Sequence, residues 1–120
     1  MPSPRQDQGY YVEQQAKRFL KKKGFIYLSQ HFQCRFGEID LIMKDGDTLV
    51  FVEVRSRQLS SYSNALESIS LNKQRKLIKA IHVYLHSHQL PHLTDCRIDI
   101  VGKDGSNKLY WIQNALEVQY

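Results

Sequence analysis

The chain has 120 residues and a formal net charge of +5, from 17 Lys and Arg against 12 Asp and Glu. This length suits one domain, and the 42% hydrophobic and 24% charged residues exclude a wholly disordered chain. The apolar runs are too short to span a membrane, and residues 1–9 lack the apolar segment of a signal peptide. We therefore expect a cytoplasmic globular protein with no membrane partner, and its basic charge favours a polyanionic partner such as nucleic acid.

The first predicted element is a helix. Residues 1–8 show no hydrophobic periodicity, so we expect a flexible tail there and one domain over residues 9–120. From Gly9 to Lys23 the apolar residues follow helical spacing and form a narrow stripe. Gly24 then suits a helix C-cap. The basic run Lys21–Lys23 in the last turn either complements the helix dipole or contacts a polyanion.

A β-hairpin is the strongest local prediction. Two segments, 36–44 and 47–57, flank Asp45-Gly46, a dipeptide typical of tight hairpin turns. An extended segment over residues 25–32 precedes them. A helix over 72–88, a strand over 95–102 and a strand over 108–112 are expected to follow. This order predicts an α/β fold, with a mixed sheet covered by helices.

The hairpin predicts an acidic face. With a two-residue loop at Asp45-Gly46, alternation places Ile39, Leu41, Met43, Val50 and Val52 on one apolar face. The opposite face carries Glu38, Asp40 and Glu53, with Glu38 directly opposite Glu53 and with Arg55 nearby. Like charges opposed across a ladder repel, so this face requires a cation, protonation or full solvation.

Two interpretations of the acidic face remain open from spacing alone. Carboxylate oxygens suit Mg²⁺ or Mn²⁺, which are often held by one or two protein carboxylates together with substrate phosphate. A solvent-facing surface neutralised by Arg55 and a neighbouring lysine is equally compatible. Lys73 and Gln74, in the first turn of the second helix, lie over its buried side. They either point toward the acidic face or are ordinary surface residues.

Three smaller features receive structural interpretations. Arg97 and Asp99 alternate onto one face of their strand, and a structural ion pair is favoured over catalysis. Cys34 and Cys96 lie far apart with no C-x-x-C motif, so both are expected to be reduced. The histidines at the end of the second helix lack Glu or Cys at ligand spacing, and we interpret them as a solvated, weakly basic face. These are His82, His86, His88 and His92.

The run GEIDLIMKDGDTLVFVEVRSR, Gly37 to Arg57, resembles the YraN family of small bacterial proteins. Weaker matches in YVEQQAKRFLKKKGF, NALESISLNKQRKL and CRIDIV extend the resemblance over nearly the whole chain. The resemblance implies a restriction-endonuclease-like fold of the PD-(D/E)XK nuclease superfamily: a mixed β-sheet with a central hairpin, flanked by helices. It also implies a Mg²⁺- or Mn²⁺-dependent endonuclease acting on DNA in preference to RNA. Structured or branched repair and recombination substrates are implied by analogy alone.

The resemblance also assigns residues. Asp40 takes the place of the superfamily's metal-binding Asp, and Glu53 that of the acidic residue in E-x-K. Glu38 belongs to the family motif and is an additional candidate ligand. Glu13 matches a first-helix acid, although an i,i+4 pair with Lys17 explains it equally well. The predicted catalytic residues are Asp40, Glu53 and Arg55; the predicted metal ligands are Asp40, Glu53, Glu38 and Glu13; the predicted nucleic-acid-binding residues are Arg55, Arg57, Lys73 and Gln74.

Arg55 departs from the superfamily pattern, because it falls where the Lys of E-x-K would be. An arginine stays charged at any working pH and cannot act as a general base, but it can clamp a phosphate with two hydrogen bonds. A non-catalytic nucleic-acid-binding module on the same fold is therefore the alternative function. A scaffold that holds a structural ion is a third. Exposed edge strands leave homodimerisation open.

Overall fold

The computed structural model describes residues 4–59, 69–90, 95–104 and 106–116, without the side chains of residues 4–9 and 56–59. In chain order its elements are α1 (Pro4–Lys22), β1 (Ile26–Cys34), β2 (Gly37–Asp45), β3 (Thr48–Leu59), α3 (Leu71–Ser87), β4 (Cys96–Asp104) and β5 (Leu109–Leu116). Neither described helix is both long and apolar enough to cross a membrane. Both cysteines are free, as predicted.

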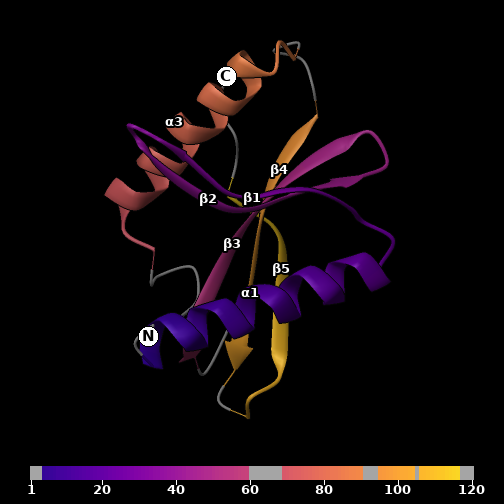
Figure 1. Ribbon diagram of the computed structural model, residues 1–120, viewed down its shortest axis with the longest axis vertical. Helices are drawn as coiled ribbons and strands as arrows, with labels where there is room; N and C mark the ends of the chain where they lie inside the picture. Colours follow the sequence, from indigo (N-terminus) through magenta and orange to yellow (C-terminus); the bar gives the residue numbers. More distant parts are fainter. Residues whose placement is uncertain (1–3, 60–68, 91–94, 105, 117–120) are drawn as a thin grey trace.

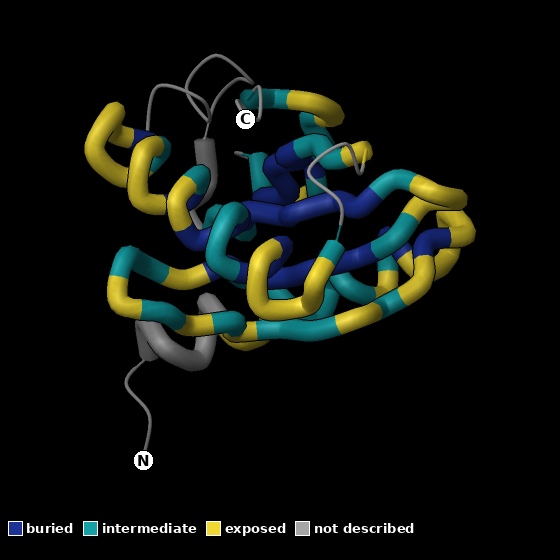
Figure 2. Tube along the Cα trace, turned by 90° about the horizontal axis from the view of Figure 1, so that it is seen from above, coloured by how far each residue is buried: buried dark blue, intermediate teal, exposed yellow. Residues whose placement is uncertain are grey.

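The five strands form one mixed sheet in the order β1-β2-β3-β4-β5 (Figure 1). β3 and β4 pair in parallel, and the other neighbouring strands pair antiparallel. The predicted α/β class is thus confirmed, and the arrangement is compatible with a restriction-endonuclease-like fold. Figure 2 shows buried residues concentrated in the central strands, between more exposed outer segments.

The two helices cover opposite faces of the sheet. Under α1, a buried cluster joins Ala16 and Leu20 of the helix to Leu41, Met43, Val50, Val52 and Val101 of the strands. Under α3, a second cluster joins Leu77, Ile81 and Tyr84 to Ile42, Leu49, Phe51 and Ile98. Each helix contributes one apolar stripe, so its remaining faces are available to polar residues.

α1 begins earlier than predicted. Its first residue is Pro4 rather than Gly9, so the predicted tail over residues 1–8 is wrong from Pro4 onward. Proline is well suited to the first helical position because the N–H that it lacks would have no helical partner there. The predicted C-cap is confirmed: Gly24 has φ +96, and its N–H donates to the carbonyl of Lys21 at 3.0 Å.

The loop of the β2–β3 hairpin differs from the prediction by one residue. Asp45 pairs with Thr48, so the loop is Gly46-Asp47. Gly46 has φ +59, and a type II′ turn requires a glycine of this kind at its first loop position. The register therefore moves by two residues. Because side chains alternate with period two, residues keep their faces while their partners change.

Ile39 is the exception to this alternation. It was predicted to lie with Leu41 and Met43, but it packs in the cluster under α3. The β2–β3 ladder ends at the pair Leu41–Val52, so Ile39 lies two residues beyond its end. Beyond that pair the hairpin no longer fixes which face a residue occupies.

Candidate functional site

A cavity of about 400 Å³ opens where the β2–β3 ladder ends and the N-terminus of α3 packs against the sheet. β2 and β3 supply its acidic wall, and α3 supplies its basic wall. It is lined by Gly37, Glu38, Asp40, Glu53, Ser70, Asn72, Lys73, Lys76 and Leu77. Several predicted site residues therefore meet around one cavity.

Asp40 lies just beyond the last hairpin pair. Its Oδ2 accepts a hydrogen bond from the backbone N–H of Val54 at 2.9 Å, so the carboxylate caps the end of β3's pairing with β2. Burial, followed by the negative charge of Glu53, raises the pKa of Asp40 from its ordinary value of 3.8 to about 8. Both residues line the cavity, so the charge of Glu53 acts on Asp40 there.

Glu53 is almost completely buried, with 2% of its side chain exposed. The ammonium of Lys73 lies 2.7 Å from its Oε1, and Nη1 of Arg55 lies 3.6 Å from the same oxygen. The hydroxyl of Ser70 caps α3 by accepting from the N–H of Lys73, which fixes Lys73 in the first turn. Two cations from two elements thus compensate one buried carboxylate, as the burial of a charge requires.

The predicted opposition of Glu38 and Glu53 is wrong. Glu38 pairs with Gln33 of β1, and the β2–β3 ladder, whose register differs by two residues from the predicted one, ends at Leu41–Val52 without reaching Glu38. Its side chain is exposed, and its Oε1 lies 3.0 Å from Nδ1 of His31. Glu38 still lines the cavity, but it lies at the cavity's rim.

Glu13 points inward from α1 toward His31 of β1, although it is not one of the residues that line the cavity. Only 14% of its side chain is exposed, and its Oε2 lies 2.7 Å from Nε2 of His31. Burial raises its pKa, and the charges of Glu38 and Glu53 add to this rise. Lys17, the alternative partner of Glu13, instead lies 4.0 Å above the ring of Tyr27. The inward orientation is therefore the one that the structure has.

His31 is the site residue that sequence reasoning missed. It joins Glu13 to Glu38 through its two ring nitrogens. Both nitrogens can donate only in the doubly protonated imidazolium. The hydrogen bond to Glu38 is the main cause that raises the pKa of His31, and the charge of Glu13 adds to it. With φ +55, His31 also interrupts the regular strand.

The four predicted metal ligands divide into two pairs. Asp40 and Glu53 repel each other inside the cavity, whereas Glu13 and Glu38 are both held by His31. Over the described ranges, no three Asp, Glu, His or Cys side chains converge so that they could hold a metal ion. The pair Asp40–Glu53 nevertheless fits Mg²⁺ or Mn²⁺, because such ions often take one or two carboxylates and complete their shell with water and phosphate.

The predicted nucleic-acid-binding residues are distributed unequally. Lys73 lines the cavity, and Arg55 lies beside Glu53. Gln74 instead donates its side-chain amide to the carbonyl of Ile69 at 2.9 Å, a contact that fixes the start of α3. Arg57 belongs to β3, but its side chain lies outside the described residues.

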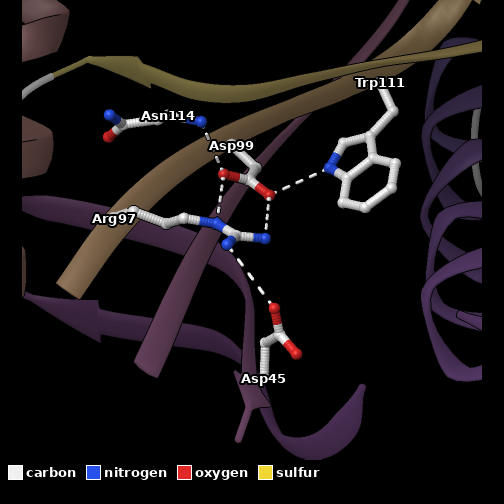
Figure 3. A network of polar contacts seen from close by, with 5 residues as sticks. All are labelled: Asp45, Arg97, Asp99, Trp111 and Asn114. Carbon is white, nitrogen blue, oxygen red and sulfur yellow. Dashed lines mark hydrogen bonds and ion pairs between the residues drawn. The ribbon is translucent and has the colours of Figure 1, made fainter. Parts of the chain in front are cut away.

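Asp99 forms a separate, structural network (Figure 3). It is fully buried, and it accepts hydrogen bonds from the Arg97 guanidinium, the Trp111 indole at 2.9 Å and the backbone N–H of Asn114 at 2.9 Å. Arg97 also pairs with Asp45 at 3.5 Å, next to the hairpin loop. The network ties β4 to β5 and to the hairpin, which confirms the predicted structural ion pair.

Three of the four histidines of the predicted solvated face lie among the described residues. His86 and His88 are exposed, as a solvated face requires, and His82 is half-buried. His88 stacks on Tyr84 with 4.0 Å between ring centroids. His92 lies outside the described residues.

Comparison with known proteins identifies relatives over nearly the full chain. The model of the family described as "Uncharacterised protein family UPF0102" matches residues 12–102. UPF0102 proteins of Coxiella burnetii (strain RSA 331) and Legionella pneumophila (strain Philadelphia 1) are each 42% identical; both alignments cover 93% of this chain, and 93% and 96% of the relative. A UPF0102 protein of Herminiimonas arsenicoxydans is also 42% identical, over 94% of this chain and 89% of its own. The chain therefore belongs to the UPF0102 family, the YraN family whose motif its hairpin carries.

Proposed function

We propose that this protein is a metal-dependent nuclease, which hydrolyses phosphodiester bonds of nucleic acid at the cavity between β2, β3 and α3. One observation carries the proposal: Asp40 and the almost completely buried Glu53 line the same cavity, with Lys73 against Glu53. The burial of Asp40 and the charge of Glu53 accordingly raise the pKa of Asp40. A fold gains nothing from forcing two carboxylates together in this way, whereas a divalent cation would relieve their repulsion.

The roles of the chain's own residues follow from their positions. Asp40 and Glu53 would hold Mg²⁺ or Mn²⁺, and such an ion polarises a phosphate and lowers the pKa of a bound water. Lys73 and Arg55 both lie against Glu53, so they are placed to bind a phosphate that approaches the same carboxylate. His31 orients Glu38 at the rim and the more buried Glu13 beside it. DNA is the proposed substrate in preference to RNA.

The test is a cleavage assay with conservative variants. The parent, Asp40→Asn and Glu53→Gln are incubated with single-stranded, double-stranded and branched DNA and with RNA, in Mg²⁺ or Mn²⁺ and in EDTA. We expect metal-dependent cleavage by the parent and its loss in both variants. Cleavage that survives in both variants, or that persists in EDTA, would refute the assignment of the site.

The second candidate function is a nucleic-acid-binding module without hydrolysis. Arg55 favours it, because it stands where the superfamily has a lysine and cannot accept a proton. Salt-sensitive nucleic-acid binding without cleavage under every condition above would support this function over the first.

A further inference from the structure

A row of basic residues leads from the cavity onto the outer surface of α3. Lys73, Lys76 and Lys79 are three positions apart, so neighbours in this series lie one above the other on the helix. The first two line the cavity. Lys79 lies beyond it, with its ammonium 5.5 Å from the centroid of the Phe36 ring.

The β1–β2 turn continues the row. The guanidinium of Arg35 lies 4.7 Å from the centroid of the Phe36 ring that Lys79 also faces. A Cβ on the neighbouring Gly37 would lie 3.4 Å from Cβ of Lys76, so the turn and α3 are in close contact. Residues from two separate parts of the chain thus form one continuous surface, which we call the basic row: Arg35, Phe36, Lys76 and Lys79.

The charges of the basic row are not compensated within the part of the chain that the structure describes. Lys73 forms an ion pair with Glu53, but none of Arg35, Lys76 and Lys79 forms one with a carboxylate there. All three side chains belong to exposed residues. Contact with the Phe36 ring restricts Arg35 and Lys79, which lowers the entropy that they lose on binding an anion.

We propose that the basic row binds the phosphate backbone of an unpaired nucleic-acid strand whose next phosphate occupies the acidic cavity. This inference rests on the proposed function and specifies its substrate class. An unpaired strand fits better than a duplex because Glu53 is buried and Asp40 is partly buried. A backbone must enter a cavity of about 400 Å³ to reach them. Proteins that bind single strands combine a positively charged track for the backbone with aromatic side chains, as the basic row combines Arg35, Lys76 and Lys79 with Phe36.

The test is a binding assay in EDTA, so that its result does not depend on hydrolysis. Fluorescence anisotropy measures the affinity of a labelled single-stranded DNA across a series of salt concentrations. The test variant combines Arg35→Gln, Lys76→Gln and Lys79→Gln. The matched control, Lys21→Gln with Lys22→Gln and Lys23→Gln, removes the same charge at the end of α1, on the opposite face of the sheet.

We expect the test variant to bind roughly tenfold to a hundredfold more weakly near 0.1 M salt, and to lose about 2 from the slope of log K against log salt. The control should keep most of the slope. A variant with Lys76→Arg and Lys79→Arg should bind like the parent, which separates charge from folding, and urea unfolding of each variant checks the fold directly.

Three outcomes would overturn the proposal: no binding by the parent at low salt, an equal loss in the test variant and its control, or tighter binding of duplex than of single strands. The cleavage assay is scored separately. Binding through the basic row without cleavage would refute the proposed hydrolysis and support the proposed binding surface. Cleavage by the parent, together with unchanged binding in the test variant, would support the proposed hydrolysis and refute the proposed binding surface.

Discussion

Replacing Asp40 by Asn should stabilise the protein, and increasingly so as the pH rises. The pKa of Asp40 is 3.8 in its ordinary state and about 8 in the fold, so the folded protein holds one more proton than the unfolded chain between these values. The free energy of unfolding therefore falls by about 1.4 kcal/mol for each pH unit over this range. The free-energy cost of ionising Asp40 in the fold is absent near pH 4 and reaches on the order of 5 kcal/mol above pH 8.

Asn at position 40 never ionises, and its amide oxygen can still accept from the N–H of Val54. Asp40→Asn should match the parent near pH 4 and exceed it by several kcal/mol at pH 9. Asp40→Ala also removes the charge, but it leaves the N–H of Val54 without this acceptor. It should therefore gain about 1–3 kcal/mol less than Asn at every pH.

Urea unfolding in EDTA, followed by the fluorescence of the single tryptophan Trp111, measures these differences. Trp111 packs edge-on against Phe19 and Phe25, so its emission reports on the core under α1. Asp47→Asn, at an exposed loop position, is the matched control. A gain in Asp40→Asn that does not change with pH would refute the reasoning, and equal gains in Asn and Ala would refute the role of the Val54 bond.

Three further predictions concern the surroundings of the site. Lys73→Met should destabilise the fold by about 1–3 kcal/mol in urea unfolding, because it leaves Glu53 buried with a weaker partner. Adding Glu53→Gln should restore most of the loss, and additive effects would contradict the pairing. The carboxylate contact that raises the pKa of His31 stabilises the fold below pH 6.5 and is lost as the pH rises through the folded pKa. His31→Gln should therefore lower stability by at most about 1 kcal/mol at pH 6 and by nothing at pH 9, and an NMR titration that puts the pKa of His31 at or below 6.5 would contradict this. Gly102→Ala should lower stability by about 1–3 kcal/mol in thermal unfolding, since its Cβ would lie 2.6 Å from the Tyr110 hydroxyl and 2.9 Å from a backbone carbonyl. An unchanged melting temperature would contradict this, because it would show that β4 and β5 move apart to accommodate the Cβ without loss of stability.

Apart from that of Ile39, the faces of the hairpin residues could be predicted, but the register of the hairpin could not. Val50 and Val52 pack under α1 and Phe51 under α3 because alternation fixes faces wherever both are buried. The sequence Asp45-Gly46-Asp47 permits Gly46 at either loop position. The two choices differ by two residues, which leaves every face unchanged. Hydrophobic pattern therefore cannot choose between them, and the predicted partner of Glu38 depended on that choice.

The acidic pair could be predicted from local sequence, whereas the contacts of His31 could not. Asp40 and Glu53 belong to one hairpin, so their proximity follows from a short loop. His31 meets Glu13 and Glu38 only because α1 and β1 both pack at the start of β2, and no local pattern encodes that packing. Its positive φ gave no signal either, since histidine adopts this conformation only occasionally.

The parallel pairing of β3 with β4 affects when the site forms during folding. The described side chains around the acidic cavity belong to residues 13–77, yet Glu53 pairs in the ladder with Ile100 of β4. Contacts between residues so distant in sequence form slowly, because a long loop must close first. During synthesis, the side chains around the acidic cavity would leave the ribosome before β4, the strand that holds β3 in place. A chain that stopped after α3 would leave β3, with Glu53 and Arg55, as an unpaired, aggregation-prone edge.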